Sequence, residues 1–268
     1  MLGPDGGPQP VVAPVIAQTV LPIPPAHGSP RRTSEAGHLG STTMTVLITV
    51  WGAAPGVGKS TLCAGLSPWL AETGLRVDHF REEEILTRPQ FAAVAEEFRA
   101  TGRVEPKTLI AAAARFVDAV VASGDDVVIA DALMPFVPTL LAMGHGEAAI
   151  DAFMTDLTEA LARVRPVMVF LDGNAQFALS RAATREGEQW LDRYVGKLAD
   201  YEVSPPVTDV ASAATYLRHE RAVTLGAVRR QDWGLIVIER ADEQPPDEVL
   251  RVAQRALRPW LGRPTPRP

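Results

Sequence analysis

The sequence predicts a three-layer α/β/α fold, in which helices cover both faces of a five-stranded parallel sheet. The first observation is that short apolar runs alternate with longer segments of helical periodicity from Thr45 onward. The second is that a glycine-rich segment directly follows the first apolar run and precedes the first helical pattern. With 268 residues, 46% of them apolar, the chain is long enough to bury a sizeable core.

Five apolar runs predict the strands, because the strands of a covered parallel sheet are buried on both faces. In chain order they are Thr45–Trp51, Leu75–Phe80, Asp126–Asp131, Pro166–Leu171 and Leu235–Ile238. Apolar residues three and four positions apart predict the helices between them. These are expected at Lys59–Glu72, Arg88–Thr101, Pro106–Ser123, about 146–164 and Asp247–Leu257. Pro68 lies inside the first of these helices and is expected to kink it.

The two ends of the chain are expected to be disordered tails. Residues 1–43 carry eight of the 23 prolines and show neither strand nor helix periodicity, and residues 263–268 are similar in composition. Residues 44–262 then form one domain. Met44 stands immediately before the first strand, so a start codon at that position is an alternative.

Composition and charge exclude several classes of function. A formal net charge of −6 argues against a general nucleic-acid binder, with a local basic patch as the alternative. No segment is long and apolar enough to span a membrane, which predicts a soluble protein. The single cysteine, Cys63, rules out an internal disulfide and fits a cytoplasmic location. The five histidines are scattered without a second ligand at metal spacing, which argues against a structural metal.

The segment after the first strand matches the phosphate-binding loop, G-x-x-x-x-G-K-[ST], with Ala53 in the first glycine position. Gly56 and Gly58 can adopt backbone angles that let successive N–H groups converge on phosphate oxygens. Lys59 would reach the outer phosphates of ATP, and the Ser60 hydroxyl would ligate Mg²⁺. The expected nucleotide contacts are Ala54, Pro55, Gly56, Val57, Gly58, Lys59, Ser60 and Thr61. The alternative is a turn that merely requires glycines.

Candidate residues for the phosphate acceptor follow the second and third strands, since ligands of parallel sheets bind beyond the carboxyl ends of the strands. Glu82 could orient or deprotonate an acceptor, and Arg81 could hold it. Asp131 could contact the acceptor or hold Mg²⁺ through water. A solvated acidic loop for Glu82 and a capping role for Asp131 are the alternatives.

A polar, mostly helical segment at about 175–225 separates the fourth and fifth strands and is broken by Ser204-Pro205-Pro206. Its first part, about 175–200, is expected to form a lid. Three arginines there are candidates for contacting the donor phosphates, because the guanidinium fork matches phosphate oxygens. They are Arg181, Arg185 and Arg193; ordinary solvated helix faces look similar. Asn174 is the only asparagine, which excludes the N-K-x-D signature of classical GTPases.

Over residues 44–262 the chain resembles the thymidylate kinase and deoxynucleoside kinase group of P-loop kinases. The loop matches, Phe80-Arg81-Glu82-Glu83 stands where that family has T-R-E-P, and Asp131 stands at its D-R motif, with Ala132 in place of the arginine. Leu191-Asp192-Arg193-Tyr194 resembles the exit of the family's lid. The resemblance implies a magnesium-dependent kinase that transfers the γ-phosphate of ATP to a nucleotide, a nucleoside or another small hydroxylated metabolite.

A switch ATPase of the partition or chaperone type is the competing class, because such proteins begin with a similar strand, loop and helix. Arg76-Val77-Asp78 also resembles their second strand. Ala54 and Pro55 stand where those proteins have an additional lysine, which favours the kinase. A nucleotide-binding module without catalytic activity is the third alternative. The acceptor and the oligomeric state, including a homodimer, are left open by the sequence.

Overall fold

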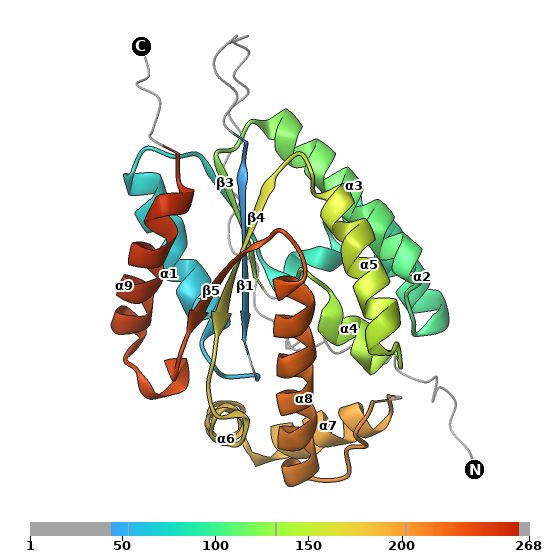
Figure 1. Ribbon diagram of the computed structural model, residues 1–268. Helices are drawn as coiled ribbons and strands as arrows, with labels where there is room; N and C mark the ends of the chain where they lie inside the picture. Colours follow the sequence, from blue (N-terminus) through green and yellow to red (C-terminus); the bar gives the residue numbers. More distant parts are fainter. Residues whose placement is uncertain (1–43, 53, 132, 202, 263–268) are drawn as a thin grey trace, which may run out of the picture.

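The computed structural model describes residues 44–52, 54–131, 133–201 and 203–262. Within them, five strands form one all-parallel sheet in the order β2-β3-β1-β4-β5 (Figure 1). All five predicted strands are confirmed, with ends that shift by one or two residues. Their bounds are β1 Val46–Gly52, β2 Val77–Phe80, β3 Val127–Asp131, β4 Arg165–Leu171 and β5 Gly234–Ile238. The expected tails at 1–43 and 263–268, together with Ala53 and Ala132, lie outside the described residues.

One face of the sheet is covered by α1 (Lys59–Glu72) and α9 (Pro246–Leu257), which lie side by side in Figure 1. Side chains alternate between the two faces along a strand. Val127 and Ile129 therefore join the apolar cluster beneath α1, while Val128 and Ala130 point to the opposite layer. The same alternation decides which polar side chains near the strand ends face α1.

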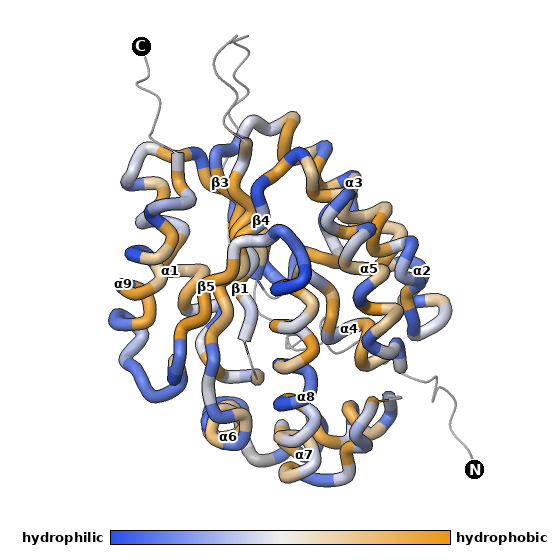
Figure 2. The backbone as a smooth tube through the Cα atoms, viewed as in Figure 1, coloured by the Kyte–Doolittle hydropathy of each residue, from blue (hydrophilic) through white to orange (hydrophobic). Residues whose placement is uncertain are grey.

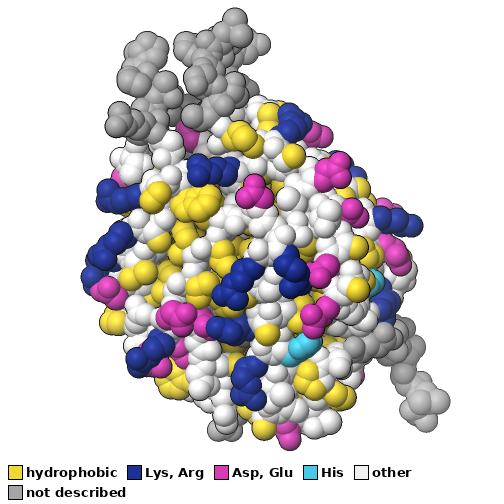
Figure 3. Space-filling view, viewed as in Figure 1, with side chains coloured by type: hydrophobic (Ala, Val, Ile, Leu, Met, Phe, Trp, Pro, Cys, Tyr) yellow, Lys and Arg dark blue, Asp and Glu magenta, His cyan; other side chains and the backbone are white. Residues whose placement is uncertain are grey.

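The other face is covered by a larger group of helices that builds the main core (Figures 1 and 2). Its members are α2 (Ala92–Thr101), α3 (Pro106–Ser123), α4 (Val137–Ala142), α5 (Glu147–Ala160) and α8 (Val210–Arg229). In Figure 2 the strands are mostly orange, as expected for a sheet covered on both sides. On the surface shown in Figure 3 both signs of charge are interspersed, and apolar side chains reach the surface between α9 and β5.

Two helices lie beyond the carboxyl ends of the strands rather than on a face of the sheet. They are α6 (Ala175–Glu186) and α7 (Glu188–Ala199), at the bottom of Figure 1. With the first half of α8 they form their own apolar cluster, which also contains Ala54 of the glycine-rich loop and Ala142 of α4. This region is therefore a packed unit that contacts the loop.

The structure differs from the predicted helices in three places. The expected helix at Arg88–Thr101 begins as a 3₁₀ turn, Pro89–Phe91, before α2 starts. Helix α4 was not predicted, because its six residues are all buried and too few to show a periodic pattern. Helix α1 continues through Pro68, which is exposed and cannot donate a hydrogen bond to the carbonyl of Ala64. None of the helices in the described part of the chain is long and apolar enough to cross a membrane.

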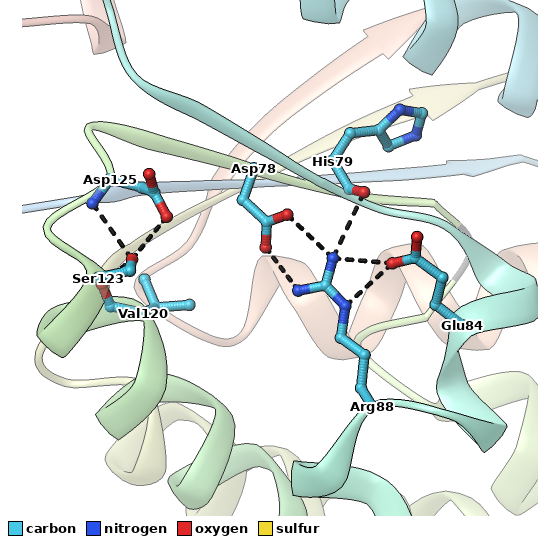
Figure 4. A network of polar contacts seen from close by, with 7 residues as sticks. All are labelled: Asp78, His79, Glu84, Arg88, Val120, Ser123 and Asp125. Atoms are coloured by element: carbon cyan, nitrogen blue, oxygen red, sulfur yellow. Dashed lines mark hydrogen bonds and ion pairs between the residues drawn. The ribbon is translucent and has the colours of Figure 1, made fainter. Parts of the chain in front are cut away.

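Arg88 fixes the chain where it leaves β2 (Figure 4). Its guanidinium donates to both carboxylate oxygens of Asp78 at 2.5 and 2.9 Å and to Glu84 at 2.8 Å. It also lies 4.3 Å from the centre of the Phe80 ring. Paired carboxylates and a cation–π contact hold an arginine strongly when it is half-buried. Arg88 therefore anchors the short 3₁₀ helix η1 (Glu82–Leu86) to the end of the sheet.

Candidate functional site

The turn between β1 and α1 has the backbone conformation that the glycines predict. Gly56 and Gly58 have φ angles of 81° and 109°, in the left-handed region. Gly58 is the N-cap of α1, and no side chain caps that end of the helix. The N–H groups of a first helical turn have no partner within the helix, so an uncapped N-terminus is a favourable place for an anion.

Lys59 is the first residue of α1 and is only 9% exposed, which is rare for a lysine. Its Nζ atom donates to the carbonyl of Ala54 at 3.4 Å and lies 5.9 Å from the centre of the Trp51 ring. A separation of 3.4 Å is long for a hydrogen bond. The ammonium group therefore lies over its own loop with one weak neutral acceptor. Among the other predicted loop contacts, Ala54, Pro55 and Val57 are buried, whereas Ser60 and Thr61 are exposed.

Three carboxyl groups from three elements lie near enough to this ammonium group to interact with it electrostatically. Asp131 ends β3, Glu82 begins η1 and Glu220 lies on α8, and each interacts electrostatically with Lys59. Burial raises the pKa of Glu82 to about 8 and the pKa of Glu220 to about 7, while Lys59 opposes both shifts. Burial also raises the pKa of Asp131, against the neighbouring Ser60 hydroxyl and Lys59. Two of the three carboxyls can thus hold a proton near neutral pH.

The structure brings Ser60, Arg81 and Asp131 together around one cavity of about 370 Å³. These residues come from α1, from the segment after β2 and from the end of β3. The Ser60 hydroxyl lies close enough to the Asp131 carboxylate to lower the pKa of that group. Oδ1 of Asp131 is buried and has no hydrogen-bond partner. The cavity thus presents one arginine, one hydroxyl and a carboxylate with a free acceptor atom.

Glu82 is not among the residues that line this cavity, and it interacts electrostatically with Lys197 of α7. The residue is 8% exposed, and its Oε1 atom is buried without a hydrogen-bond partner. Burial lowers the pKa of Lys197 to about 8, and Glu82 opposes that shift. The Glu82 carboxyl, which the sequence predicts to contact the acceptor, is therefore buried where both Lys59 and Lys197 interact with it.

Sequence reasoning missed Lys197 and Glu220 as members of this site. Lys197 is one of three lysines in a chain that otherwise uses arginine, and that rarity was the only available signal. Glu220 lies more than 150 residues after the loop, in the segment Tyr216–Arg221 that resembles the closing segment of the kinase family but that gave Glu220 no role. Only the packing of α7 and α8 over the loop reveals that both approach it.

The predicted lid arginines make other contacts. Arg181 donates to the main-chain oxygen of Asp242 at 2.9 Å, Arg185 pairs with Glu186 at 2.7 Å, and Arg193 is exposed. The helix that carries the first two nevertheless packs on the loop. A Cβ atom at Gly56 would lie 2.8 Å from the Ala178 carbonyl oxygen, so a side chain there would displace α6. A role of the three arginines toward a donor stays a prediction.

We expect the stability of the protein to fall as the pH rises from about 5 to about 8. The folded state holds a proton on Glu82 up to about pH 8, whereas the unfolded chain loses it near 4.5. The folded state thus binds more protons in this window, and its stability decreases with pH. Glu82→Gln has no proton to lose and should flatten the profile by on the order of 1–3 kcal/mol.

Urea unfolding of both proteins at pH 5.5 and pH 8 measures this difference. Glu83→Gln is the matched control, because it makes the same charge change at an exposed neighbouring position. Lys197 has a pKa of about 8, so its loss of a proton changes the dependence of stability on pH mainly above pH 8. Parallel profiles for the parent and Glu82→Gln would contradict the prediction.

In comparisons with known proteins, the chain matches no protein-family model and no curated protein.

Proposed function

We propose that the chain is an ATP- and magnesium-dependent phosphotransferase, similar to thymidylate kinases, that phosphorylates a nucleotide, a nucleoside or another small hydroxylated metabolite. The observation that carries the proposal is the meeting of Lys59, the uncapped N-terminus of α1 and the buried carboxyls of Glu82 and Asp131 at one end of the sheet. Ligands of open parallel sheets bind at that end of the strands.

The donor side of the proposed site is the glycine-rich loop. The main-chain N–H groups near Gly58 would bind the phosphates of ATP, and the dipole of α1 would favour their negative charge. Lys59 makes one long hydrogen bond, to the Ala54 carbonyl. Replacing that acceptor with a phosphate oxygen therefore costs little free energy. A fixed cation beside the transferring group stabilises the charge that develops there.

The residues present fit a magnesium ion, which prefers hard oxygen ligands. The Ser60 hydroxyl and the Asp131 carboxylate are neighbours, and Oδ1 of Asp131 is a buried acceptor without a partner. Magnesium bound here would neutralise phosphate charge and orient the donor. Asp131 would hold it directly or through water.

The acceptor side is the cavity next to Ser60. Arg81 lines it and would hold an anionic or polar group of the acceptor. Glu82 follows Arg81 directly but does not line the cavity. Its pKa of about 8 is close to the pH at which a general base works best, and it would receive the hydroxyl proton after a movement of α6 and α7 exposes it to the acceptor. Because the reaction uses ATP, we expect the enzyme to be cytoplasmic. Its partners would be small molecules rather than nucleic acid or membrane.

We expect α6 and α7 to act as a lid that moves when substrates bind. The cavity directly over Lys59, bounded by Ala54, Tyr194 and Glu220, is only about 20 Å³, and α6 closely covers Gly56. A triphosphate therefore requires these helices to shift, which would bring Arg181, Arg185 and Arg193 to new partners.

Amide exchange across residues 175–200 should slow when a bisubstrate mimic binds, because the ligand orders a lid. Exchange that stays unchanged there, with protection confined to the loop around Gly58, would contradict a lid; α9 is the internal control.

The function itself is tested by phosphate transfer. A thermal-shift screen of nucleosides, nucleotides and aminoglycoside-like alcohols, with ADP and magnesium present, identifies acceptor candidates. Radiolabelled ATP then measures transfer to each hit, and ADP release should depend on the acceptor. Slow ADP release that no acceptor changes, accompanied by nucleotide-dependent dimerisation, would instead favour the switch ATPase.

A further inference from the structure

Three side chains with metal-binding atoms face each other between α1 and the sheet. Along β2, Val77 packs toward α1 and Phe80 toward the opposite core, so alternation turns His79 toward α1. In Figure 4 the imidazole of His79 points away from Arg88, on the other side of the strand. By the same alternation Asp131 follows Val127 and Ile129 toward α1, where Cys63 is fully buried.

The geometry of this cluster is that of an incomplete metal site. One ligand atom each from Cys63, His79 and Asp131 lies within 4.8 Å of the other two. A tetrahedral zinc site with bonds of about 2.0–2.3 Å separates its ligands by about 3.3–3.8 Å, so the cluster needs to close by roughly 1 Å. Nε2 of His79 and Oδ1 of Asp131 are both buried without a hydrogen-bond partner, and Asp131 is only 3% exposed. Buried polar atoms without partners are uncommon and call for an explanation.

A cation can reach the cluster, because His79 and Asp131 line the cavity of about 370 Å³. We propose that Cys63, His79 and Asp131 bind a zinc-type divalent cation, with a fourth coordination position open to this cavity. Thiolate, imidazole and carboxylate together suit zinc, whereas magnesium rejects sulfur and nitrogen. On binding, the Cys63 thiol gives its proton to water, and no other bond changes.

This site goes beyond the proposed phosphotransfer, and binding of the cation does not depend on that reaction. The two are linked through Asp131, which lies beside Ser60 and also belongs to the cluster. An Asp131 carboxylate drawn toward Cys63 and His79 is withdrawn from Ser60. Zinc is therefore expected to oppose magnesium-supported nucleotide binding. The spacing of His and Cys in the sequence gives no sign of the cluster, since its members are 16 and 52 residues apart along the chain.

Cobalt titration of the full chain tests the site directly. Cobalt replaces zinc in such sites, and a cobalt–thiolate bond gives a near-ultraviolet charge-transfer band. Cys63 is the only cysteine, so the band reports on this thiol alone. We expect the band to saturate at one cobalt per chain, to disappear on adding zinc and to be absent in Cys63→Ser. His79→Asn should weaken cobalt affinity at least about tenfold, while His145→Asn, a change in the turn before α5, should leave it unaltered.

The proposal is overturned if the parent protein gives no band, if the band persists in Cys63→Ser, or if His79→Asn and His145→Asn bind cobalt equally well. Circular dichroism of each variant before titration establishes that it is folded. His79→Asn also carries the test if Cys63→Ser fails to fold, because His79 is only half-buried. A site that binds zinc without affecting nucleotide binding would remove the link through Asp131 but leave the metal site in place.

Discussion

Lys59→Ala is expected to lower the rate of phosphate transfer by about 10²–10³-fold, the usual loss when one oriented donor is removed from a charged transition state. The reason lies in its surroundings. Lys59 is the cation that Glu82, Asp131 and Glu220 share, and it stands at the N-terminus of α1 behind Gly58. Removing Lys59 takes away the positive charge that offsets these carboxyls, which also disfavours binding of a triphosphate.

Steady-state transfer and ATP binding, measured with the acceptor found by the screen, provide the test. Lys107→Ala is the matched control, because Lys107 is exposed in the first turn of α3 and has the same side chain. The control should retain parental turnover. Parental nucleotide affinity and turnover in Lys59→Ala would exclude the proposed function and would reduce the loop to a glycine-dependent turn.

The centre of the sheet was predictable from the sequence because β1, β3 and most of β4 are buried on both faces. A run such as Val127-Val128-Ile129-Ala130 contains no polar residue, and Asp126 and Asp131 mark its two ends. The left-handed angles of Gly56 and Gly58 were predictable for a related reason, since few other residues tolerate them. Local physics determines both features.

The surroundings of the acidic segment after β2 could not be predicted from the segment itself. Its three consecutive glutamates look alike in the sequence, but the structure gives them different surroundings. Glu82 is buried beside Lys197, Glu83 is exposed at the cavity, and Glu84 pairs with Arg88. The 3₁₀ turn separates them, and its position depends on the contacts of Arg88 with Asp78 and Phe80. No pattern within the segment encodes those contacts.

The same limit applies to Lys197, Glu220 and the Cys63 cluster. Each becomes part of a site only because elements that are distant in the sequence pack together. Helix α7 brings Lys197 to Glu82, α8 brings Glu220 to Lys59, and strand alternation turns His79 toward Cys63. Sequence spacing records neighbours along one element, whereas these contacts join different elements.

At saturating magnesium, Glu82→Gln and Asp131→Asn, made separately, are expected to leave ATP binding nearly intact while at least one of them loses transfer by about 10²–10⁴-fold, the usual cost of removing a positioned base. The two residues should fail in different ways. If Glu82 receives the acceptor proton, the parental rate rises with pH toward about 8, and Glu82→Gln loses that rise. If Asp131 mainly holds magnesium beside Ser60, Asp131→Asn requires more magnesium but keeps the parental pH profile.

Stability separates these outcomes from simple unfolding. Glu82→Gln removes a buried group that would otherwise ionise, so at pH 8 the variant should be at least as stable as its parent while transferring phosphate far more slowly. A variant that transfers phosphate slowly but is more stable has lost a catalytic group, because damage to the fold would lower both the transfer rate and the free energy of unfolding. If both variants transfer phosphate at the parental rate, the two carboxyls only shape the cavity. The acceptor would then bind elsewhere, and the space between α5 and the α6–α7 region is the next place to search.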